Sequence, residues 1–471
     1  MTSRSPLIHA ICFLTILCLV LSPLCLFPSR AMALSIEEET VLGQKFLAEI
    51  KKHYEVLDND YANAFINDLG QYLTGALKTK PFPFHFYIIK DSSLNAFSAP
   101  GGLIFFYSGL IDTMDNCDML AAVMAHEIGH SAARHLSHRV EQNTKIGLAT
   151  MAGILAGVLI GGGAAASALI TGSMAAGIQA QLHYSREDER QADQLGFRYS
   201  TECGFSPQGL IEALKKIEQG SWMGSGKTPP YLLTHPTGPE RMANIDSMVK
   251  QYSAVPVKKE ADHFRTLFPI FKTVVRAVSI DPDEAEREFL EDLKHAPTSP
   301  MAHLGLGMVY EAQSEYGEAI SQLKKALEQR PDSVLILRTL GKNYQLAGKD
   351  REAIRILKKA LTLKNEDTTS LFTLALSYEN LESYQKAIAL LKRLASLEPS
   401  RNEIYYHLGI SYGRQNRLAL AHYNFGLYFK ALGELQKARF HFQKAKELAQ
   451  NDSGLLEKIR KATKPKRQKA L

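Results

Sequence analysis

The chain of 471 residues contains only five cysteines, and three of them lie within the first 33 residues. This segment begins near the basic residue Arg4, continues as an apolar run from Ile11 to Phe27 that Pro23 interrupts, and ends in Ala31-Met32-Ala33. A basic start, an apolar run and a site of small residues are typical of a secretory signal peptide. We therefore expect residues 1–33 to be removed by cleavage. An uncleaved anchor is the alternative, since the run approaches the shortest length that spans a bilayer.

Cleavage would leave two cysteines, Cys117 and Cys203, and therefore room for at most one disulfide bond within the chain. Disulfides persist in the compartments that exported proteins reach. A bridge would join two segments of the same domain. Small buried thiols are the commoner state of such residues, and we expect that state here.

A net positive charge is also concentrated in one short segment. The formal net charge is +6, but Lys458 to Leu471 alone holds seven basic residues and no acidic one. The body of the chain is therefore slightly acidic, which argues against a nucleic-acid partner. We expect residues 451–471 to form a solvated basic tail, with contact to anionic lipid as the alternative.

Residues 146–178 contain no charged side chain at all, and eight glycines interrupt this apolar stretch, including Gly161-Gly162-Gly163. Each half would form a helix of about 22 Å, which is shorter than a hydrocarbon layer of about 30 Å. Two membrane spans are therefore not expected. We expect residues 146–180 to form a lid or helical hairpin over a functional site, with membrane-surface contact and a single span as alternatives.

The most informative motif present is His126-Glu127-Ile128-Gly129-His130, which has the pattern H-E-x-x-H. No proline lies between Pro100 and Pro207, and apolar residues recur around the motif at helical spacing, so we expect a helix. The two histidines would project from one helix face and bind one ion, while Glu127 could take a proton from metal-bound water. The motif predicts a hydrolase with one Zn²⁺ per chain.

A catalytic zinc ion usually has three protein ligands, so a third must lie elsewhere. The compact pattern H-E-x-x-H-x-x-G-x-x-H fails because alanine and leucine occupy its last two defined positions. We expect the nearby His135 and His138 to be solvated helix residues. Glu189 and Asp193 share one helix face, so one could bind zinc while the other accepts a hydrogen bond from a ligand imidazole.

Two strand-like runs flank a turn just before the motif. Phe84 to Ile89 alternates and is rich in aromatic residues, and Asn95 to Ala99 is separated from Leu103 to Tyr107 by Pro100-Gly101-Gly102. We expect a strand followed by a hairpin beside the helix. An edge strand there could align an extended peptide through main-chain hydrogen bonds, or it could be an ordinary sheet edge.

Three stretches together, NAFSAPGG from Asn95, the HEIGH motif and SREDERQADQLG from Ser185, resemble the zincin peptidases related to HtpX and the prenyl-protein endopeptidases. The pattern of that family is H-E-x-x-H followed by E-x-x-A-D. The resemblance implies a set of roles at matching positions. These are zinc ligation by His126, His130 and Glu189, general-base catalysis by Glu127, and orientation of a ligand histidine by Asp193.

A further histidine, in Thr234-His235-Pro236, matches a stretch found in the same peptidases and is hypothesised to reach the metal. His235 could donate a hydrogen bond to the oxyanion of the reaction, or it could fill the fourth position of the ion and keep the enzyme latent. A loop histidine with neither role is the third alternative.

Beyond Gln251 the chain repeats itself with the period of tetratricopeptide units, and small and aromatic residues recur at the positions typical of such units. The recurring residues are Gly307, Tyr310, Ala319 and Leu323; Gly341, Tyr344, Ala353 and Leu357; Ala375, Tyr378, Ala387 and Leu391; and Gly409, Tyr412, Ala421 and Phe425. After Gly409 the pattern recurs already at Gly426, half a period later, so one helix near Leu418 to Phe429 is expected to serve two units. Such units stack in order to bury their apolar faces.

The predicted fold is mainly α: a signal peptide (1–33), a zinc metalloprotease domain with a small β-sheet (34–260), a tetratricopeptide α-solenoid (261–450) and a basic tail (451–471). The family resemblance implies a periplasmic endopeptidase, with membrane association as an option. It would cleave misfolded or stalled outer-membrane proteins, while the repeats recruit substrate or the outer-membrane β-barrel assembly machinery. The alternative is a chaperone or scaffold for outer-membrane protein assembly with a latent protease site.

Overall fold

The computed structural model describes residues 34–141, 184–223, 228–252, 256 and 258–464. It divides into two compact units, Met1–Phe271 and Lys272–Leu471, and the division falls inside one helix, α14 (Lys259–Ser279). The predicted signal peptide and the apolar segment 146–180 lie outside the described residues. Among the helices that are described, none combines the length and the apolar content that a membrane span requires.

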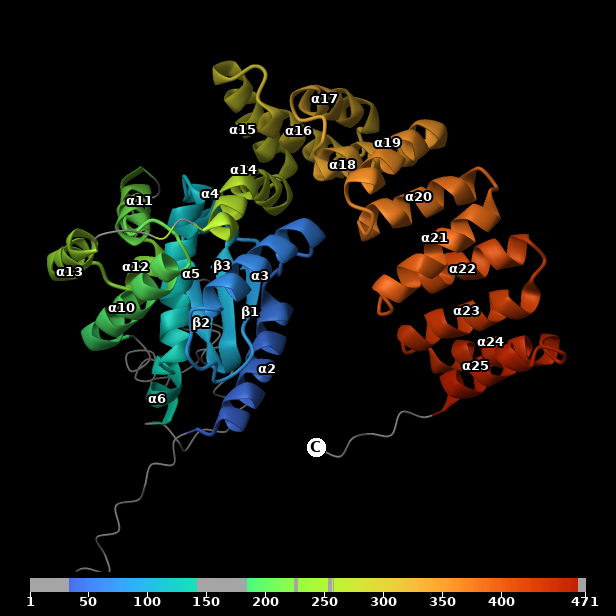
Figure 1. Cartoon of the computed structure of the whole chain (residues 1–471), viewed down its shortest axis with the longest axis horizontal. Helices are drawn as coiled ribbons and strands as arrows, with labels where there is room; N and C mark the ends of the chain where they lie inside the picture. Colours follow the sequence, from blue (N-terminus) through green and yellow to red (C-terminus); the bar gives the residue numbers. More distant parts are fainter. Residues whose placement is uncertain (1–33, 142–183, 224–227, 253–255, 257, 465–471) are drawn as a thin grey trace, which may run out of the picture. The chain divides into compact units, whose positions relative to one another are not determined.

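The first unit is a group of helices around a small sheet (Figure 1). Its elements up to residue 141 are α2 (Ile36–His53), α3 (Asp60–Thr74), β1 (His85–Ile89), β2 (Ala96–Ala99), a 3₁₀ turn η2 (Pro100–Gly102), β3 (Leu103–Tyr107), α4 (Ser108–Thr113), α5 (Cys117–Ala132) and α6 (His135–Glu141). From residue 184 onward come α10 (Arg186–Glu202), α11 (Gly209–Met223), α12 (Pro230–Thr234), α13 (Pro239–Gln251) and the start of α14.

The sheet has the strand order β1-β3-β2, with β1 parallel and β2 antiparallel to the central β3. The predicted hairpin is confirmed, because β2 and β3 pair from Ala99 opposite Leu103 to Ala96 opposite Phe106. Gly101 adopts a positive φ of 75° in the connecting turn, a conformation that favours glycine. Strand β2 is an edge of the sheet, yet all four of its residues are buried.

Two helices pack closely enough to bring distant parts of the sequence together. Helix α5 begins at a side-chain cap, where Asn116 accepts a hydrogen bond from the Met119 amide, and α10 begins at a capping box built by Ser185 and Asp188. At the crossing, a β-carbon on Gly196 would lie 2.8 Å from the backbone of His126. Only glycine allows this approach, which sets the first turns of α10 beside the second half of α5.

Cys117 and Cys203 are free and buried, so the bridge considered from the sequence is absent and the expectation of buried thiols is confirmed. Cys117 is the first residue of α5 and Cys203 follows the last residue of α10. The Tyr72 hydroxyl donates a 2.8 Å hydrogen bond to the Cys203 carbonyl oxygen. Burial raises the pKa of the Cys203 thiol to about 11 and also raises that of Cys117.

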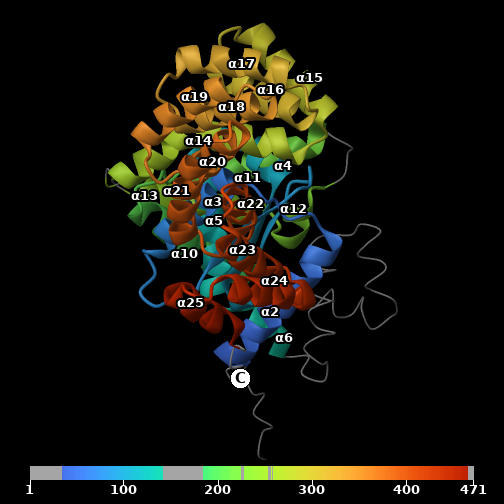
Figure 2. The same cartoon turned by 90° about the vertical axis from the view of Figure 1, so that its right-hand side faces the viewer.

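The second unit is a series of antiparallel helices stacked one after another, which Figures 1 and 2 show from two sides. The helices are α15 (Pro282–His295), α16 (Pro300–Ala312), α17 (Tyr316–Gln329), α18 (Val334–Leu346), α19 (Asp350–Leu363), α20 (Thr368–Asn380), α21 (Tyr384–Leu397), α22 (Glu403–Arg414), α23 (Leu418–Ala431), α24 (Leu435–Leu448) and α25 (Ser453–Thr463). The repeating pattern of the sequence therefore corresponds to helical pairs.

The predicted sharing of one helix between two units is confirmed at α23. A β-carbon on Gly409 in α22 would lie 2.7 Å from the ring of Phe425, which belongs to α23. Further along α23, a β-carbon on Gly426 would lie 2.7 Å from the ring of Phe442 in α24. The same helix thus offers an aromatic ring to the preceding helix and a small residue to the following one.

The region predicted as a solvated tail begins with a helix. Residues 453–463 form α25, which is capped by Asp452 and buries Leu455 and Ile459 against Phe442 and neighbouring residues of α24. The apolar residues recur at helical spacing among the basic ones, so this segment is an amphipathic helix. The high number of basic residues alone indicated a solvated tail. Residues 465–471 lie outside the described residues.

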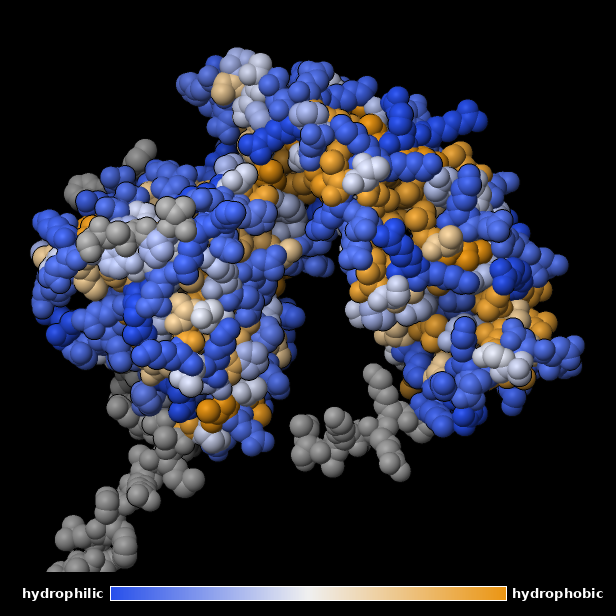
Figure 3. Space-filling view, viewed as in Figure 1, coloured by the Kyte–Doolittle hydropathy of each residue, from blue (hydrophilic) through white to orange (hydrophobic). Residues whose placement is uncertain are grey.

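The helical array also carries apolar side chains on its surface (Figure 3). Leucines with exposed fractions between 37% and 45% occur near the ends of four successive helices, α18 to α21. They are Leu346, Leu363, Leu381 and Leu397. Their positions near helix ends repeat with the units, so the exposed apolar surface follows the array.

Candidate metal centre

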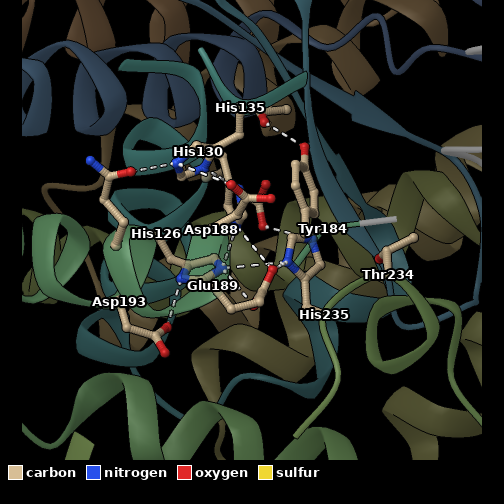
Figure 4. A network of polar contacts seen from close by, with 12 residues as sticks. His126, His130, His135, Tyr184, Asp188, Glu189, Asp193, Thr234 and His235 are labelled. Atoms are coloured by element: carbon tan, nitrogen blue, oxygen red, sulfur yellow. Dashed lines mark hydrogen bonds and ion pairs between the residues drawn. The ribbon is translucent and has the colours of Figure 1, made fainter. Parts of the chain in front are cut away.

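Four side chains converge in the first unit on a point between α5, α10 and the end of α12 (Figure 4). His126 and His130 come from α5, Glu189 from α10, and His235 follows the last residue of α12. One nitrogen or carboxylate oxygen from each lies within 4.8 Å of the others, and all four residues are buried. The structure therefore brings together three residues predicted as ligands and the additional histidine.

The distances within this group suit the ligands of one ion. The Nε2 atoms of His126 and His130 are 3.1 Å apart, and Glu189 Oε1 lies 3.2 Å from His130 Nε2 and 2.9 Å from His235 Nδ1. Ligands of a tetrahedral zinc ion, each at about 2.0–2.1 Å, lie about 3.3 Å from one another. Imidazole nitrogen and carboxylate oxygen are also donors that Zn²⁺ accepts, so the residues fit such an ion.

The protonation preferences of these residues favour cation binding. Burial lowers the pKa of His130 well below its usual value, so the ring is neutral at pH 7. Burial alone would raise the pKa of Glu189, but the adjacent His235 and His130 outweigh that effect and hold it well below its usual value. A neutral imidazole and an ionised carboxylate are the forms that bind a metal.

Glu127 lies directly beside the group and is completely buried. Its Oε1 atom is 3.5 Å from His235 Nε2, and neither of its carboxylate oxygens has a hydrogen-bond partner among the described residues. Burial raises the pKa of this carboxyl, although His235 and His126 oppose the shift. A carboxylate with a raised pKa and unused oxygens can exchange a proton with a bound molecule.

Asp193 lies behind His126, with its Oδ1 atom 2.9 Å from His126 Nδ1. Burial would raise its pKa, but His126 and Arg241 outweigh burial and lower it. Arg241 donates two hydrogen bonds of 2.9 Å to Asp193 and approaches Glu189 Oε2 to 2.7 Å. Its Nη1 also donates to the carbonyl oxygen of His235 at 3.2 Å.

Sequence patterns did not predict the place of Arg241 in this centre. It stands in α13, shortly after His235, and no ligand pattern includes it. A single arginine near the start of a helix gives no signal by itself. Only the folded structure reveals that its guanidinium is buried between the two carboxylates.

The expectation that His135 is a solvated helix residue is wrong, because only 3% of it is exposed. Its Nδ1 atom lies 3.0 Å from His130 Nδ1. Figure 4 draws His135 within this network of polar contacts. Helix α5 ends at Ala132, and Arg134 adopts a positive φ of 56°, so His135 does not continue the helical path assumed for it. His138, in contrast, is exposed as expected.

Tyr184 covers the side of the centre that faces the edge strand. Its ring centroid lies 3.9 Å from that of His130 and 5.1 Å from that of His235, and its hydroxyl is 3.3 Å from Ser98 Oγ of β2. This contact contributes to the burial of β2. All four residues of β2, the strand considered for aligning a peptide, are buried.

A cavity of about 720 Å³ adjoins the centre between α10 and α13. Its wall includes Tyr184, Glu189 and Asp193 and also Arg186 and Asn244. The wall is about equally polar and apolar, and it carries charges of both signs. It offers a bound chain a space that reaches the candidate ligands.

Comparison with known protein families agrees with this geometry. Residues 62–249 match the model of peptidase family M48, and residues 298–366, 372–423 and 419–452 match tetratricopeptide repeat models. The chain carries an M48 peptidase domain followed by tetratricopeptide repeats. The predicted fold class, a mainly helical protease domain with a small sheet and a tetratricopeptide array, is therefore confirmed.

The chain is also similar to several curated proteases. The chain is 29% identical over 299 residues to a putative beta-barrel assembly-enhancing protease of Vibrio cholerae (62% of this chain, 61% of the relative). It is 30% identical over 239 residues to the beta-barrel assembly-enhancing protease of Escherichia coli (50% and 49%). It is 30% identical over 189 residues to the metalloprotease LoiP of Escherichia coli (38% and 66%). The chain thus matches about half to two thirds of these relatives' lengths.

Proposed function

We propose that the M48 domain is a zinc-dependent endopeptidase in which His126, His130 and Glu189 bind the ion. The proposal rests on one observation: two imidazole nitrogens and a carboxylate oxygen lie at ligand spacing, with the unpartnered carboxylate of Glu127 beside them. When bound, a zinc ion polarises a peptide carbonyl and lowers the pKa of water.

The other side chains of the centre transfer protons or hold the ligands in position. Glu127 accepts the proton of the attacking water and returns it to the leaving amine. Asp193 Oδ1 lies 2.9 Å from His126 Nδ1. A proton on Nδ1 is favoured beside this carboxylate, which leaves His126 Nε2 unprotonated for the ion. Arg241 keeps Asp193 in place.

We propose that the enzyme acts in the periplasm and that its natural substrates are misfolded or stalled outer-membrane proteins. The support is the description of two relatives as beta-barrel assembly-enhancing proteases. The repeats would recruit either the substrate or the outer-membrane assembly machinery, and their exposed leucines supply an apolar surface for such a contact.

A chaperone or scaffold with a latent protease site is the second candidate. It is favoured by the position of His235, whose Nδ1 lies 3.4 Å from His126 Nε2 and 2.9 Å from Glu189 Oε1. A fourth protein ligand closes a zinc site against water. Complementation separates the two candidates: in cells that lack the protein, a Glu127→Gln variant would restore full function only if the chaperone role suffices.

The peptidase assignment is tested by purified variants assayed for zinc content and for cleavage of an unfolded protein. Glu127→Gln should retain zinc and lose cleavage, whereas His130→Ala should lose zinc as well. Glu187→Gln is the matched control, because Glu187 lies in α10 with 71% of its side chain exposed. Cleavage by Glu127→Gln at the wild-type rate would refute the assignment.

A further inference from the structure

We propose that His135 is a positioning residue of the metal centre: it accepts the Nδ1 hydrogen of His130 and thereby keeps His130 Nε2 unprotonated and directed at the ion. The inference rests on the proposed function, because it presumes that His130 is a ligand. It assigns a role to a histidine that lies outside both the H-E-x-x-H motif and the E-x-x-A-D motif.

The hydrogen-bond geometry around His135 fixes the direction of this contact. Its Nε2 atom lies 2.8 Å from Gln191 Oε1 and 3.9 Å from Asp188 Oδ1. The Gln191 oxygen is within hydrogen-bond distance and can only accept, so the proton of the neutral imidazole is on Nε2, where the nearby carboxylate of Asp188 also favours it. The Nδ1 atom of His135 is then an acceptor, and it lies 3.0 Å from His130 Nδ1. His130 must therefore carry its own proton on Nδ1.

A metal-binding imidazole needs such an acceptor. The ligand nitrogen must be unprotonated, and the other ring nitrogen donates to a group that holds the ring in its tautomer and orientation. For His126, the group beside the second ring nitrogen is Asp193, whose Oδ1 atom lies 2.9 Å from His126 Nδ1. For His130 the corresponding place is held by His135. Each of the two motif histidines thus has a separate acceptor, a carboxylate for one and an imidazole for the other.

The backbone turn between α5 and α6 positions His135 for its contact with His130. In a continuous helix, residue 135 would lie about 140° around the axis from residue 130 and would point elsewhere. The helix instead ends at Ala132, and Arg134 turns the chain with a positive φ of 56°. Arg134 Nε donates a 2.8 Å hydrogen bond to the buried carboxylate of Glu39, which anchors the turn.

The test measures zinc affinity of the full protein by competition with a chromophoric chelator. His135→Ala should weaken zinc binding about 10- to 100-fold, which is the usual effect of losing such a partner. His135→Gln should recover most of the affinity, because its amide oxygen can accept the same hydrogen. His138→Ala is the matched control in the same helix, and it should bind zinc like the wild type.

A second measurement reads the tautomer directly. Long-range ¹H–¹⁵N spectra of the zinc-loaded protein should show the His130 proton on Nδ1 in the wild type and in His135→Gln. If His135→Ala fails to fold, as judged by circular dichroism, Gln191→Leu replaces it. Loss of the Nε2 acceptor should weaken zinc binding, whereas Gln191→Glu, which keeps an acceptor, should not.

Two outcomes overturn the inference: wild-type affinity in His135→Ala, or in Gln191→Leu where that variant replaces it, or a His130 proton on Nε2. The failure of the proposed function looks different, because His130→Ala would then retain wild-type zinc affinity. If His130→Ala loses zinc while His135→Ala keeps it, only the positioning role is refuted.

Discussion

Arg241 and Asp193 are joined by two parallel hydrogen bonds of 2.9 Å in the buried interior of the M48 domain. Arg241→Ala would leave the carboxylates of Asp193 and Glu189 without their cationic partner. Breaking a buried pair in this way costs about 3–5 kcal/mol. We expect that loss in the free energy of unfolding, measured in urea at a fixed zinc concentration.

Arg241→Lys should also destabilise the domain, because a lysine cannot form both parallel bonds. Arg190→Ala is the control for both changes, since 54% of the Arg190 side chain is exposed. If Arg241→Ala changes the free energy of unfolding by less than about 0.5 kcal/mol, the size usual for surface substitutions, Arg241 does not stabilise the domain through this pair.

Replacement of His235 separates the roles considered for it. Its ring lies within 3.5 Å of Glu127, Glu189 and His126, so it occupies space that a water molecule and a substrate carbonyl would need. We therefore expect His235→Ala to raise the rate of peptide cleavage several-fold at unchanged zinc content. A loss of cleavage would identify His235 as a transition-state donor, and an unchanged rate would identify a loop histidine.

Gly196→Ala should damage the metal centre from a distance. The added β-carbon would meet the His126 backbone at 2.8 Å and force α10 away from α5. Overpacking of this kind costs about 1–3 kcal/mol, and the shift of Glu189 should weaken zinc binding as well. Gly317→Ala, in the helix α17, has nothing within 4 Å of the new atom and should cost no stability. Equal melting temperatures for the two variants would refute the packing argument.

The buried thiols should resist alkylation in the folded protein. A raised pKa lowers the fraction of thiolate, which is the reactive form, and the pKa of Cys203 is raised to about 11. At pH 8, peptide mapping after iodoacetamide treatment should find Cys117 and Cys203 unmodified in the native protein and alkylated in urea. A peptide in which the two are bridged would disprove the free state.

Local patterns were enough to predict several parts of this molecule. The hairpin follows from Pro-Gly-Gly between apolar runs, and α23 follows from a repeat that recurs after half of its usual period. Spacing also placed Glu189 and Asp193 on one helix face, which the structure bears out. Each of these inferences depends on residues that are neighbours along the chain or at a fixed period.

The missed features depend on contacts between segments that are far apart in sequence. The burial of His135 depends on the positive φ of Arg134, which ends the helical spacing before His135 and which the motif pattern does not predict. Arg241 was overlooked because its partners, Asp193 and Glu189, belong to α10, from which α11 and α12 separate it along the chain. The final helix α25 was hidden by a high content of basic residues around Leu455 and Ile459.

Because α23 belongs to two successive helical pairs, it limits how this array can be lengthened or shortened. Because α23 closes the pair with α22 and opens the pair with α24, no cut beside it releases a complete two-helix module. A recombination or design step at this point would have to add or remove a single helix, which corresponds to the interval between Gly409 and Gly426. At α23 the repeating step of the array thus falls from a pair of helices to a single helix.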